Sequence, residues 1–275
     1  MSHAPSPPPT TLVVPCYNEA SRLDLPAFAQ ALAEQSALAL LFVDDGSADA
    51  TRALLDAFAD AHPGRVGVYA MSRNGGKAAA VRAGLLRALS AAADGECSIV
   101  GYWDADLATP LPVAAEMAAL LHDRPACVAV LGSRVRLLGR CIDRRPVRHY
   151  LGRVFATVAS AALRMPVYDT QCGAKLFRAG PALARALEAP FTSRWAFDVE
   201  LLARLREATG WCDADESFVE LPLLAWHDVA GSKMRAGAAL RAGLDLLRIA
   251  ATVRGPDRRS VSPLAGRPPV PTARP

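Results

Sequence analysis

Two aspartates separated by one residue, Asp104 and Asp106, are the strongest sign of chemistry in this sequence. They follow the apolar run 97–103, which we expect to be a buried parallel strand. Alternate residues of an extended chain point to the same side, so both carboxylates leave the end of that strand together. Crowded carboxylates are stabilised by a cation, and oxygen ligands suit Mg²⁺ or Mn²⁺. The pair predicts a divalent-metal site, with aspartates that only shape a turn as the alternative.

Three other polar clusters follow predicted strands in the first half of the chain. Residues 74–77, Asn-Gly-Gly-Lys, open an alanine-rich helix, so their backbone N–H groups and the Lys77 ammonium predict an anion site suited to a diphosphate. Asp44 and Asp45 offer acceptors for ribose hydroxyls or a base N–H, although an acidic turn before a helix would use the same residues. The third cluster comprises Pro15, Tyr17, Asn18 and Glu19. Together with the metal pair, these clusters outline a site for a nucleoside diphosphate.

The elements that must position these clusters alternate between short apolar strands and helices rich in alanine and leucine. The predicted strands are Thr11–Pro15, Leu38–Val43, Val66–Ala70, Ser98–Trp103 and Cys127–Leu131. The predicted helices between them are Leu25–Gln35, Asp49–Ala61, Lys77–Ala92 and Leu111–Leu121. Repeated units of this length imply an α/β fold, Rossmann-like, with a mostly parallel sheet and helices on both faces. Ligands bind beyond the carboxyl ends of the strands in such sheets, where the polar clusters lie.

Two amphipathic helices are predicted in the second half, at 146–165 and 233–251. Each can pack on the core as a surface helix or lie in a membrane interface, since basic residues occupy its polar face. For the first helix both remain open, and for the second we expect core packing through the face that carries Leu240, Leu244 and Leu247. One folded domain is expected over 11–251.

The composition of the chain limits its partners and its location. The 275 residues are 52% hydrophobic, yet no apolar run reaches the length of about 18–20 residues that a membrane-spanning helix needs. Residues 1–10 are proline-rich, lack the apolar core of a signal peptide and are expected to be disordered. Residues 252–275 form a basic tail, also expected to be disordered, that suits an anionic membrane better than nucleic acid because no aromatic residues are interleaved. We expect a cytoplasmic protein, peripheral at the cytoplasmic face of the membrane.

Four ordered motifs resemble those of the inverting GT-A glycosyltransferases of family 2. They are Pro15-Cys16-Tyr17-Asn18-Glu19, Asp44-Asp45-Gly46-Ser47, Asn74-x-Gly76-Lys77 and Asp104-Ala105-Asp106. Further motifs resemble the dolichyl-phosphate β-glucosyltransferase branch of that family: 104–110, 132–134, 169–173 with Lys175 and Phe177, 194–200, and 226–227 followed by 231–233. The resemblance covers about residues 11–251. It implies transfer of glucose from UDP-glucose to a polyprenyl phosphate of the dolichyl type, with Mg²⁺ or Mn²⁺.

The chain departs from the pattern of that branch at a few positions. Cys16 and Ala48 stand where alanine and threonine are usual, and Ala174 stands where an aromatic residue is common, which alters packing near the sugar or the acceptor. Eukaryotic members carry an N-terminal membrane anchor, whereas this chain has its proline-rich residues 1–10. We therefore expect surface helices or a partner to reach the membrane. The composition, rich in alanine and arginine, suggests a bacterial protein, for which the expected acceptor is a polyprenyl phosphate other than dolichol.

A lipid phosphate is already anionic at neutral pH, so its attack on a sugar requires no general base. The donor is then expected to contact the first three clusters and the metal pair: Pro15, Tyr17, Asn18, Glu19, Asp44, Asp45, Asn74, Gly76, Lys77, Asp104, Ala105 and Asp106. The cations expected at the acceptor phosphate are Arg134, Arg145, Arg148, Lys175, Arg194 and Lys233. Asp104, Asp106, Arg134, Arg194 and Asp198 form the expected catalytic set.

Several alternatives remain open at this stage. Asp198 becomes the base candidate if the acceptor is a hydroxyl. Asp198 and Glu200 can instead contact the sugar or orient the arginines. The donor can be GDP-mannose or UDP-GlcNAc, the acceptor can be soluble, and the protein can be a non-catalytic nucleotide-sugar-binding protein.

Overall fold

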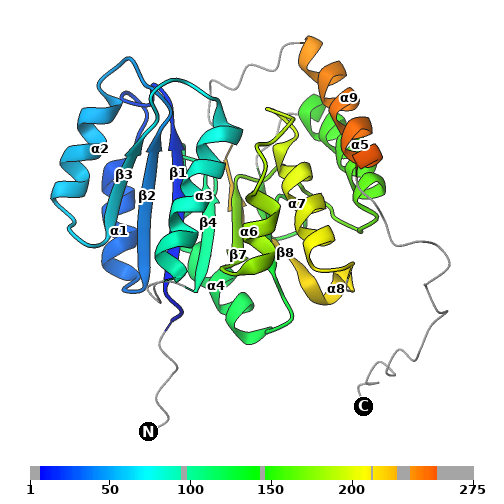
Figure 1. Ribbon diagram of the computed structural model, residues 1–275, viewed down its shortest axis with the longest axis horizontal. Coiled ribbons are helices and arrows are strands. Elements are labelled where there is room, and N and C mark those ends of the chain that lie inside the picture. The colour runs from blue at the N-terminus through cyan, green and yellow to red at the C-terminus, as the bar shows by residue number, and fades with distance from the viewer. Residues whose placement is uncertain (1–6, 94–97, 143–145, 212, 228–235, 253–275) are drawn as a thin grey trace, which may run out of the picture.

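The computed structural model describes residues 7–93, 98–142, 146–211, 213–227 and 236–252. Within this part of the chain, seven strands form one sheet in the order β3-β2-β1-β4-β7-β5-β8, and helices lie on both of its faces (Figure 1). The predicted α/β class is confirmed.

The first half of the chain alternates strand and helix, as predicted. Its elements are β1 (Thr10–Cys16), α1 (Leu25–Glu34), β2 (Leu38–Asp44), α2 (Thr51–Asp60), β3 (Val66–Ala70), α3 (Lys77–Ala93), β4 (Ile99–Trp103) and α4 (Val113–Asp123). The second half continues with β5 (Ala129–Ser133), β6 (Cys141–Ile142), α5 (Pro146–Leu163), β7 (Ala174–Arg178), α6 (Pro181–Leu187), α7 (Phe197–Ala208), α8 (Ala214–Ser217), β8 (Phe218–Pro222), β9 (Ala225–Trp226) and α9 (Ala236–Thr252). Every predicted strand and helix up to residue 131 is present, with ends shifted by at most two residues.

Hydrophobic cores on both faces explain why the strands read as continuous apolar runs. Leu12 and Val14 of β1 are buried in one core with side chains of α1 and α4, whereas Val13 is buried in the other core against α3. All five residues of β4 are buried as well. Alternate side chains of each central strand therefore serve opposite cores, so neither face can be polar.

The order of the strands places one crevice at the centre of the sheet. The chain runs from β1 outward to β2 and β3 and then crosses back to β4, on the other side of β1; β1 pairs in parallel with both β2 and β4. Only β7 is antiparallel to its neighbours, β4 and β5. The carboxyl ends of β1, β2 and β4 thus meet where the strand order reverses, which is where α/β sheets bind ligands.

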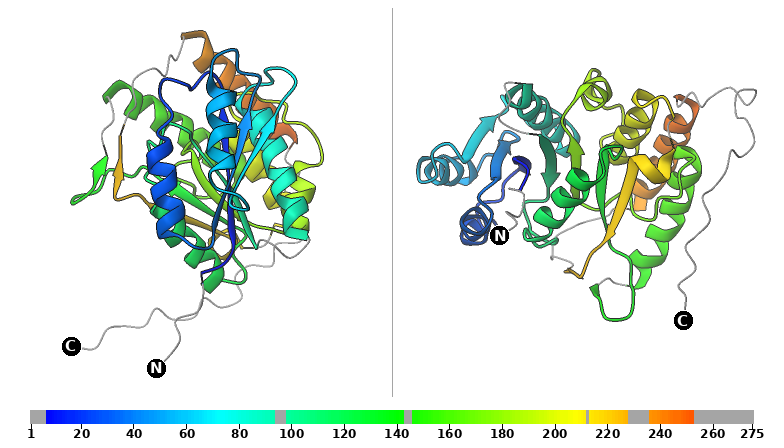
Figure 2. Two further views of the ribbon diagram at one scale, coloured as in Figure 1. Left: turned by 90° about the vertical axis from the view of Figure 1, so that its left-hand side faces the viewer. Right: turned by 90° about the horizontal axis from the view of Figure 1, so that it is seen from below.

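Helices α5 and α9 pack against one another at one end of the molecule (Figures 1 and 2). On α9, Leu246 and Ile249 are buried, whereas Leu244 and Leu247 are 49% and 65% exposed. The helix therefore packs on the core through a different face from the predicted one, and the prediction that Leu244 and Leu247 face the core is wrong. On α5, Val154 is likewise exposed. None of the described helices is long and apolar enough to cross a membrane.

Candidate active site

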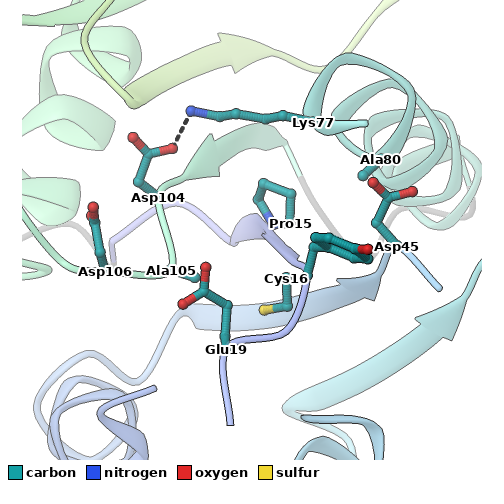
Figure 3. A pocket seen from close by; sticks show the side chains of 10 residues that line it. Pro15, Cys16, Glu19, Asp45, Lys77, Ala80, Asp104, Ala105 and Asp106 are labelled. Atoms are coloured by element: carbon teal, nitrogen blue, oxygen red, sulfur yellow. Dashed lines mark hydrogen bonds and ion pairs between the residues drawn. The ribbon is translucent and has the colours of Figure 1, made fainter. Parts of the chain in front are cut away.

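A cavity of about 240 Å³ lies at the carboxyl ends of β1, β2 and β4 (Figure 3). Its walls are formed by Pro15, Cys16, Tyr17, Glu19, Asp45, Lys77, Ala80, Asp104, Ala105 and Asp106. All of these residues except Cys16 and Ala80 belong to the set predicted from the sequence. Cys16 and Ala80 carry no side-chain chemistry that marks a site, and only their places beside Pro15 and one turn after Lys77 point to the cavity.

The two aspartates that follow β4 both face this cavity. The backbone N–H of Asp104 donates to the carbonyl of Gly173 at 3.1 Å, and Asp106 accepts the N–H of Ala108 at 3.1 Å. Figure 3 shows the carboxylates of Asp104, Asp106 and Glu19 directed into the same space. Partial shielding of its carboxylate from water in the cavity, and then the neighbouring Asp104 charge, raise the pKa of Asp106 above its usual value. A cation between the two carboxylates would relieve this repulsion.

Lys77, the first residue of α3, reaches across the cavity and forms an ion pair with Asp104 (Figure 3). The two side chains are 42% and 33% exposed, so the pair is open to solvent. Burial lowers the pKa of Lys77, but the carboxylates of Asp104, Asp198 and Asp106 together outweigh it, so the net shift is upward. Burial likewise opposes the charge on Asp104, and Lys77 reverses that effect and lowers the pKa of Asp104. Both groups are therefore charged at neutral pH.

The chemistry of this acidic pair fits a divalent ion whose ligands come partly from the protein and partly from a substrate. Within the described residues, no group of three or more histidine, cysteine, aspartate or glutamate side chains could hold a metal by itself. Mg²⁺ is typically held by one or two carboxylates together with substrate phosphates and water. Asp104 and Asp106 could supply the protein's share of such a shell, and a diphosphate the rest.

Gly173 supports Asp104, a role that the sequence analysis did not assign to it. A Cβ atom added to Gly173 would overlap the carboxylate of Asp104. Glycine is therefore the residue that leaves room for this carboxylate against the loop before β7. The available signal was its place beside Cys172 in the 169–173 motif.

The loop before α3 differs from its predicted form. The N–H groups of Gly75 and Gly76 donate to the two carboxylate oxygens of Asp45, at 2.6 and 2.8 Å, and Asp45 is only 2% exposed. These two N–H groups are thus already used inside the protein, so of the predicted anion site the Lys77 ammonium is the part that faces the cavity, and its binding of a diphosphate stays a prediction. Asp45 instead fixes the loop from which Lys77 extends.

Four residues of the predicted donor set lie outside the cavity wall: Asn18, Asp44, Asn74 and Gly76. Asp44 accepts the N–H of Ser47 at 3.0 Å, and the side chain of Asn18 accepts the N–H of Ala48 at 2.9 Å. These two residues shape the turn after β2, as the structural alternative for Asp44 anticipated.

Asp198 and Lys175 form a buried network below the metal pair. The Lys175 side chain is fully buried, and its ammonium donates to Asp198 at 2.8 Å and to the carbonyl of Cys172. Tyr102, on β4, also donates to Asp198. Burial, and then the Asp198 charge, raise the pKa of Tyr102 well above its usual value, so its phenol keeps its proton. The prediction that Lys175 meets an acceptor phosphate is wrong, because its charge is enclosed and paired.

Arg134 is also paired inside the protein. Its guanidinium forms a bidentate ion pair with Asp169, at 2.6 and 2.8 Å, and the two side chains are 12% and 7% exposed. Burial lowers the pKa of Arg134, but Asp169 outweighs it and the net shift is upward. The pair joins the end of β5 to the loop before β7, so we do not assign Arg134 to the acceptor phosphate.

Among the described cations of the predicted acceptor set, Arg194 lies against the loop from which Lys77 extends, next to the cavity wall but not part of it. It donates to the carbonyl of Gly75 at 3.3 Å, and a Cβ atom on Gly76 would meet its guanidinium. It forms no ion pair with any described carboxylate. Glu200 holds the loop that carries Arg194 by accepting the N–H groups of Thr192 and Ser193.

The remaining predicted cations fall outside what the structure describes. Arg145 and Lys233 lie outside the described residues, and for Arg148, on α5, only the backbone is described. Their predicted contacts with an acceptor phosphate stay predictions.

Comparison with known proteins assigns the chain to a family. A sequence profile described as "Glycosyl transferase family 2" matches residues 11–182, which is more than half of the chain. The chain belongs to glycosyl transferase family 2. The protein is therefore a glycosyltransferase, as its motifs predicted, and the alternative of a non-catalytic binding protein is set aside.

Two relatives within this family share most of the chain. Dolichyl-phosphate beta-glucosyltransferase ALG5C of Trichomonas vaginalis is 31% identical over 261 residues, covering 90% of this chain and 72% of its own. The human dolichyl-phosphate beta-glucosyltransferase is 30% identical over 266 residues, covering 87% of this chain and 74% of its own. The predicted resemblance to this branch is confirmed.

Solved structures share the fold at lower identity. The glucosyl-3-phosphoglycerate synthase of Mycobacterium tuberculosis matches 91% of this chain and 82% of its own, with a TM-score of 0.60 and 19% identity. The same enzyme in complex with Mn²⁺, UDP and glucosyl-3-phosphoglycerate matches with a TM-score of 0.58 and 18% identity. These likenesses confirm the glycosyltransferase fold of this family member.

Proposed function

We propose that this glycosyltransferase moves glucose from UDP-glucose to a polyprenyl phosphate, with inversion to a β-linked lipid-phosphate sugar. The observation that carries the proposal is the convergence of Asp104, Asp106 and Lys77 on one cavity where the strand order reverses. The names of the two family relatives support glucose as the sugar and a dolichyl-type phosphate as the acceptor.

The donor is held by opposite charges at its diphosphate. Asp104 and Asp106 are placed to hold Mg²⁺ or Mn²⁺, and such an ion, when bound, neutralises charge on the departing diphosphate. Lys77 and Arg194 add two positive charges at the same edge of the sheet. Fixed charges aimed at a leaving group stabilise the charge that develops on it. The nucleoside then lies along the wall that contains Tyr17 and the Asp45 loop.

The acceptor is a group that attacks without a general base. Asp198, the base that a hydroxyl acceptor would need, is 5% exposed and bonded to Tyr102 and Lys175. This placement favours an acceptor whose attacking oxygen is already anionic, such as a phosphate monoester. Arg194, which lies against the loop that carries Lys77 and forms no ion pair with a described carboxylate, is the described cation that we expect to attract it.

The acceptor's lipid chain is expected to remain in the membrane, which the enzyme meets through α5 and α9 at the cytoplasmic face. Val154 and Val158 of α5 and Leu244 and Leu247 of α9 are all exposed. Exposed apolar side chains on paired helices suit the boundary between headgroups and acyl chains. Arg248, with 77% of its side chain exposed, is paired with the less exposed Asp245 at 3.4 Å and presents the outer charge of that pair to anionic lipids.

A panel of donors and acceptors tests the proposal. Purified protein is incubated with UDP-glucose, UDP-GlcNAc or GDP-mannose, with a short polyprenyl phosphate or with 3-phosphoglycerate, and with Mg²⁺, Mn²⁺ or EDTA. We expect transfer only from UDP-glucose to the lipid phosphate, loss of transfer with EDTA, and a β anomer by NMR. Preferred use of GDP-mannose, transfer to 3-phosphoglycerate alone, or an α-linked product would contradict the proposal.

A further inference from the structure

Lys77 and a divalent ion cannot both use the same face of Asp104. The Lys77 ammonium is bonded to one carboxylate oxygen of Asp104, so in this state of the protein it takes the place of an external cation. Asp106 has no such partner among the described cations and instead accepts the N–H of Ala108. Half of the acidic pair is thus neutralised from within.

The side chain of Asp104 has little room to change its orientation and bind an ion elsewhere. Gly173 lies directly against its carboxylate, and the Asp104 N–H is bonded to the carbonyl of the same glycine. Tyr102, two residues earlier on β4, is fully buried and bonded to Asp198. Because the aspartate is held on both sides, an ion can approach its bonded oxygen only if Lys77 leaves.

Lys77, by contrast, can leave. Its side chain is 42% exposed, has a flexible stem and begins at the first residue of α3, facing the cavity. A diphosphate in that cavity carries more negative charge than one carboxylate and offers the ammonium a second partner within reach. Ion pairs as exposed as Lys77 and Asp104 contribute little to stability, so such an exchange costs little.

We propose that Lys77 is an internal counter-ion that blocks Asp104 in the free protein and is drawn away by a nucleoside diphosphate, so that the donor and the divalent ion bind cooperatively. The inference rests on the proposed donor class and adds a preferred order of binding: the ion binds weakly until the diphosphate draws Lys77 away from Asp104. Since linkage is reciprocal, the ion must strengthen diphosphate binding by the same factor.

Metal binding, measured without turnover, tests the exchange. The affinity for Mn²⁺ is determined by electron paramagnetic resonance of the free ion, with the protein alone and with saturating UDP. We expect Lys77→Met to raise the Mn²⁺ affinity of the free protein about two- to five-fold, the factor that corresponds to the exposed pair. The Mn²⁺ affinity of the UDP complex should stay within error of wild type, so the coupling between UDP and Mn²⁺ falls. Lys77→Arg, which keeps the pair, should behave like wild type.

A charge-matched control separates competition from a general field. Arg87 lies on the same helix, is exposed and stacks on Tyr69, so Arg87→Met removes one positive charge away from the cavity. It should leave both Mn²⁺ affinities unchanged. Equal gains of Mn²⁺ affinity in Lys77→Met with and without UDP, or no gain at all, would overturn the exchange without contradicting the proposed function. Failure of the wild-type protein to bind UDP and Mn²⁺ together would instead overturn the proposed function and, with it, the exchange.

Discussion

Two lysine–aspartate pairs lie near the carboxyl end of β4 and behave in opposite ways. In the first, Lys77 and Asp104 have 42% and 33% of their side chains exposed and share a cavity. In the second, Lys175 and Asp198 are 0% and 7% exposed and are enclosed by Tyr102 and the loop before β7. The same two residue types therefore form an ion pair that can change partners in one region and a permanent ion pair in the other.

The difference follows from the cost of separating charges in each environment. An exposed pair contributes about 0–1 kcal/mol, because water solvates both partners when they part. A buried pair is costly to break, since removing one partner leaves an uncompensated charge away from water. The open pair can accordingly exchange partners with a substrate, and the buried pair holds β7 against α7.

The largest effect is expected from the open region. Asp106→Ala should reduce glucosyl transfer by about 10³-fold or more, since one of two carboxylates at the metal is lost where charge develops on the diphosphate. The free energy of unfolding should stay near the wild-type value, because Asp106 is exposed. Turnover and urea denaturation check the two halves of this prediction, and wild-type turnover would remove Asp106 from the metal site.

The buried pair should show the reverse behaviour. Lys175→Met leaves the Asp198 charge without its ammonium, and we expect a loss of about 3–5 kcal/mol in the free energy of unfolding. Urea denaturation measures this loss. The double variant with Asp198→Asn should recover a large part of the loss, because no unpaired charge then remains. Unchanged stability in Lys175→Met would contradict the assignment of this pair as a permanent contact.

The boundary between the two regions can be tested at Gly173. Gly173→Ala places a methyl group where the Asp104 carboxylate lies, so the carboxylate must shift. We expect the affinity for Mn²⁺ in the presence of UDP to fall about tenfold, as for other residues that orient a metal ligand. Gly152→Ala is the matched control, since a Cβ atom there meets nothing within 4 Å. Equal Mn²⁺ affinities in the two variants would show that Gly173 does not position Asp104.

The smallest effect is expected on the outer face of the second region, where neither pair is involved. Replacing Leu244 and Leu247 with glutamate adds charge to exposed positions of α9. Co-sedimentation with anionic vesicles should fall about tenfold, while stability and donor binding stay unchanged. Leu86→Glu, at a position of α3 that is 37% exposed, serves as the control. If the α9 variant still sediments like wild type, α9 does not contact the lipid surface.

Local patterns were sufficient to predict the first half of the fold and most of the cavity. Apolar runs that alternate with alanine-rich stretches identified the strands and helices up to residue 131, because the period of each pattern is a local property. Strand ends of a parallel sheet meet at one edge, so Asp45, Lys77 and Asp104 could be brought together before any coordinates were known. The antiparallel direction of β7 and the exposure of the α9 leucines could not be predicted in this way, since both depend on which elements pack beside them in the tertiary structure.

The amino-acid sequence by itself determined the kind of chemistry: an acidic pair at a strand end, a lysine at a helix start and the repeated units that bring them to one edge. Only the tertiary structure decided which charges are available. Asp45 takes the N–H groups of residues 30 and 31 positions away, and Asp198 meets Tyr102 across 96 positions. Whether a charged side chain is paired inside the protein or available to a ligand depends on the partner that packing brings to it. In both of these examples, that partner comes from a distant part of the chain.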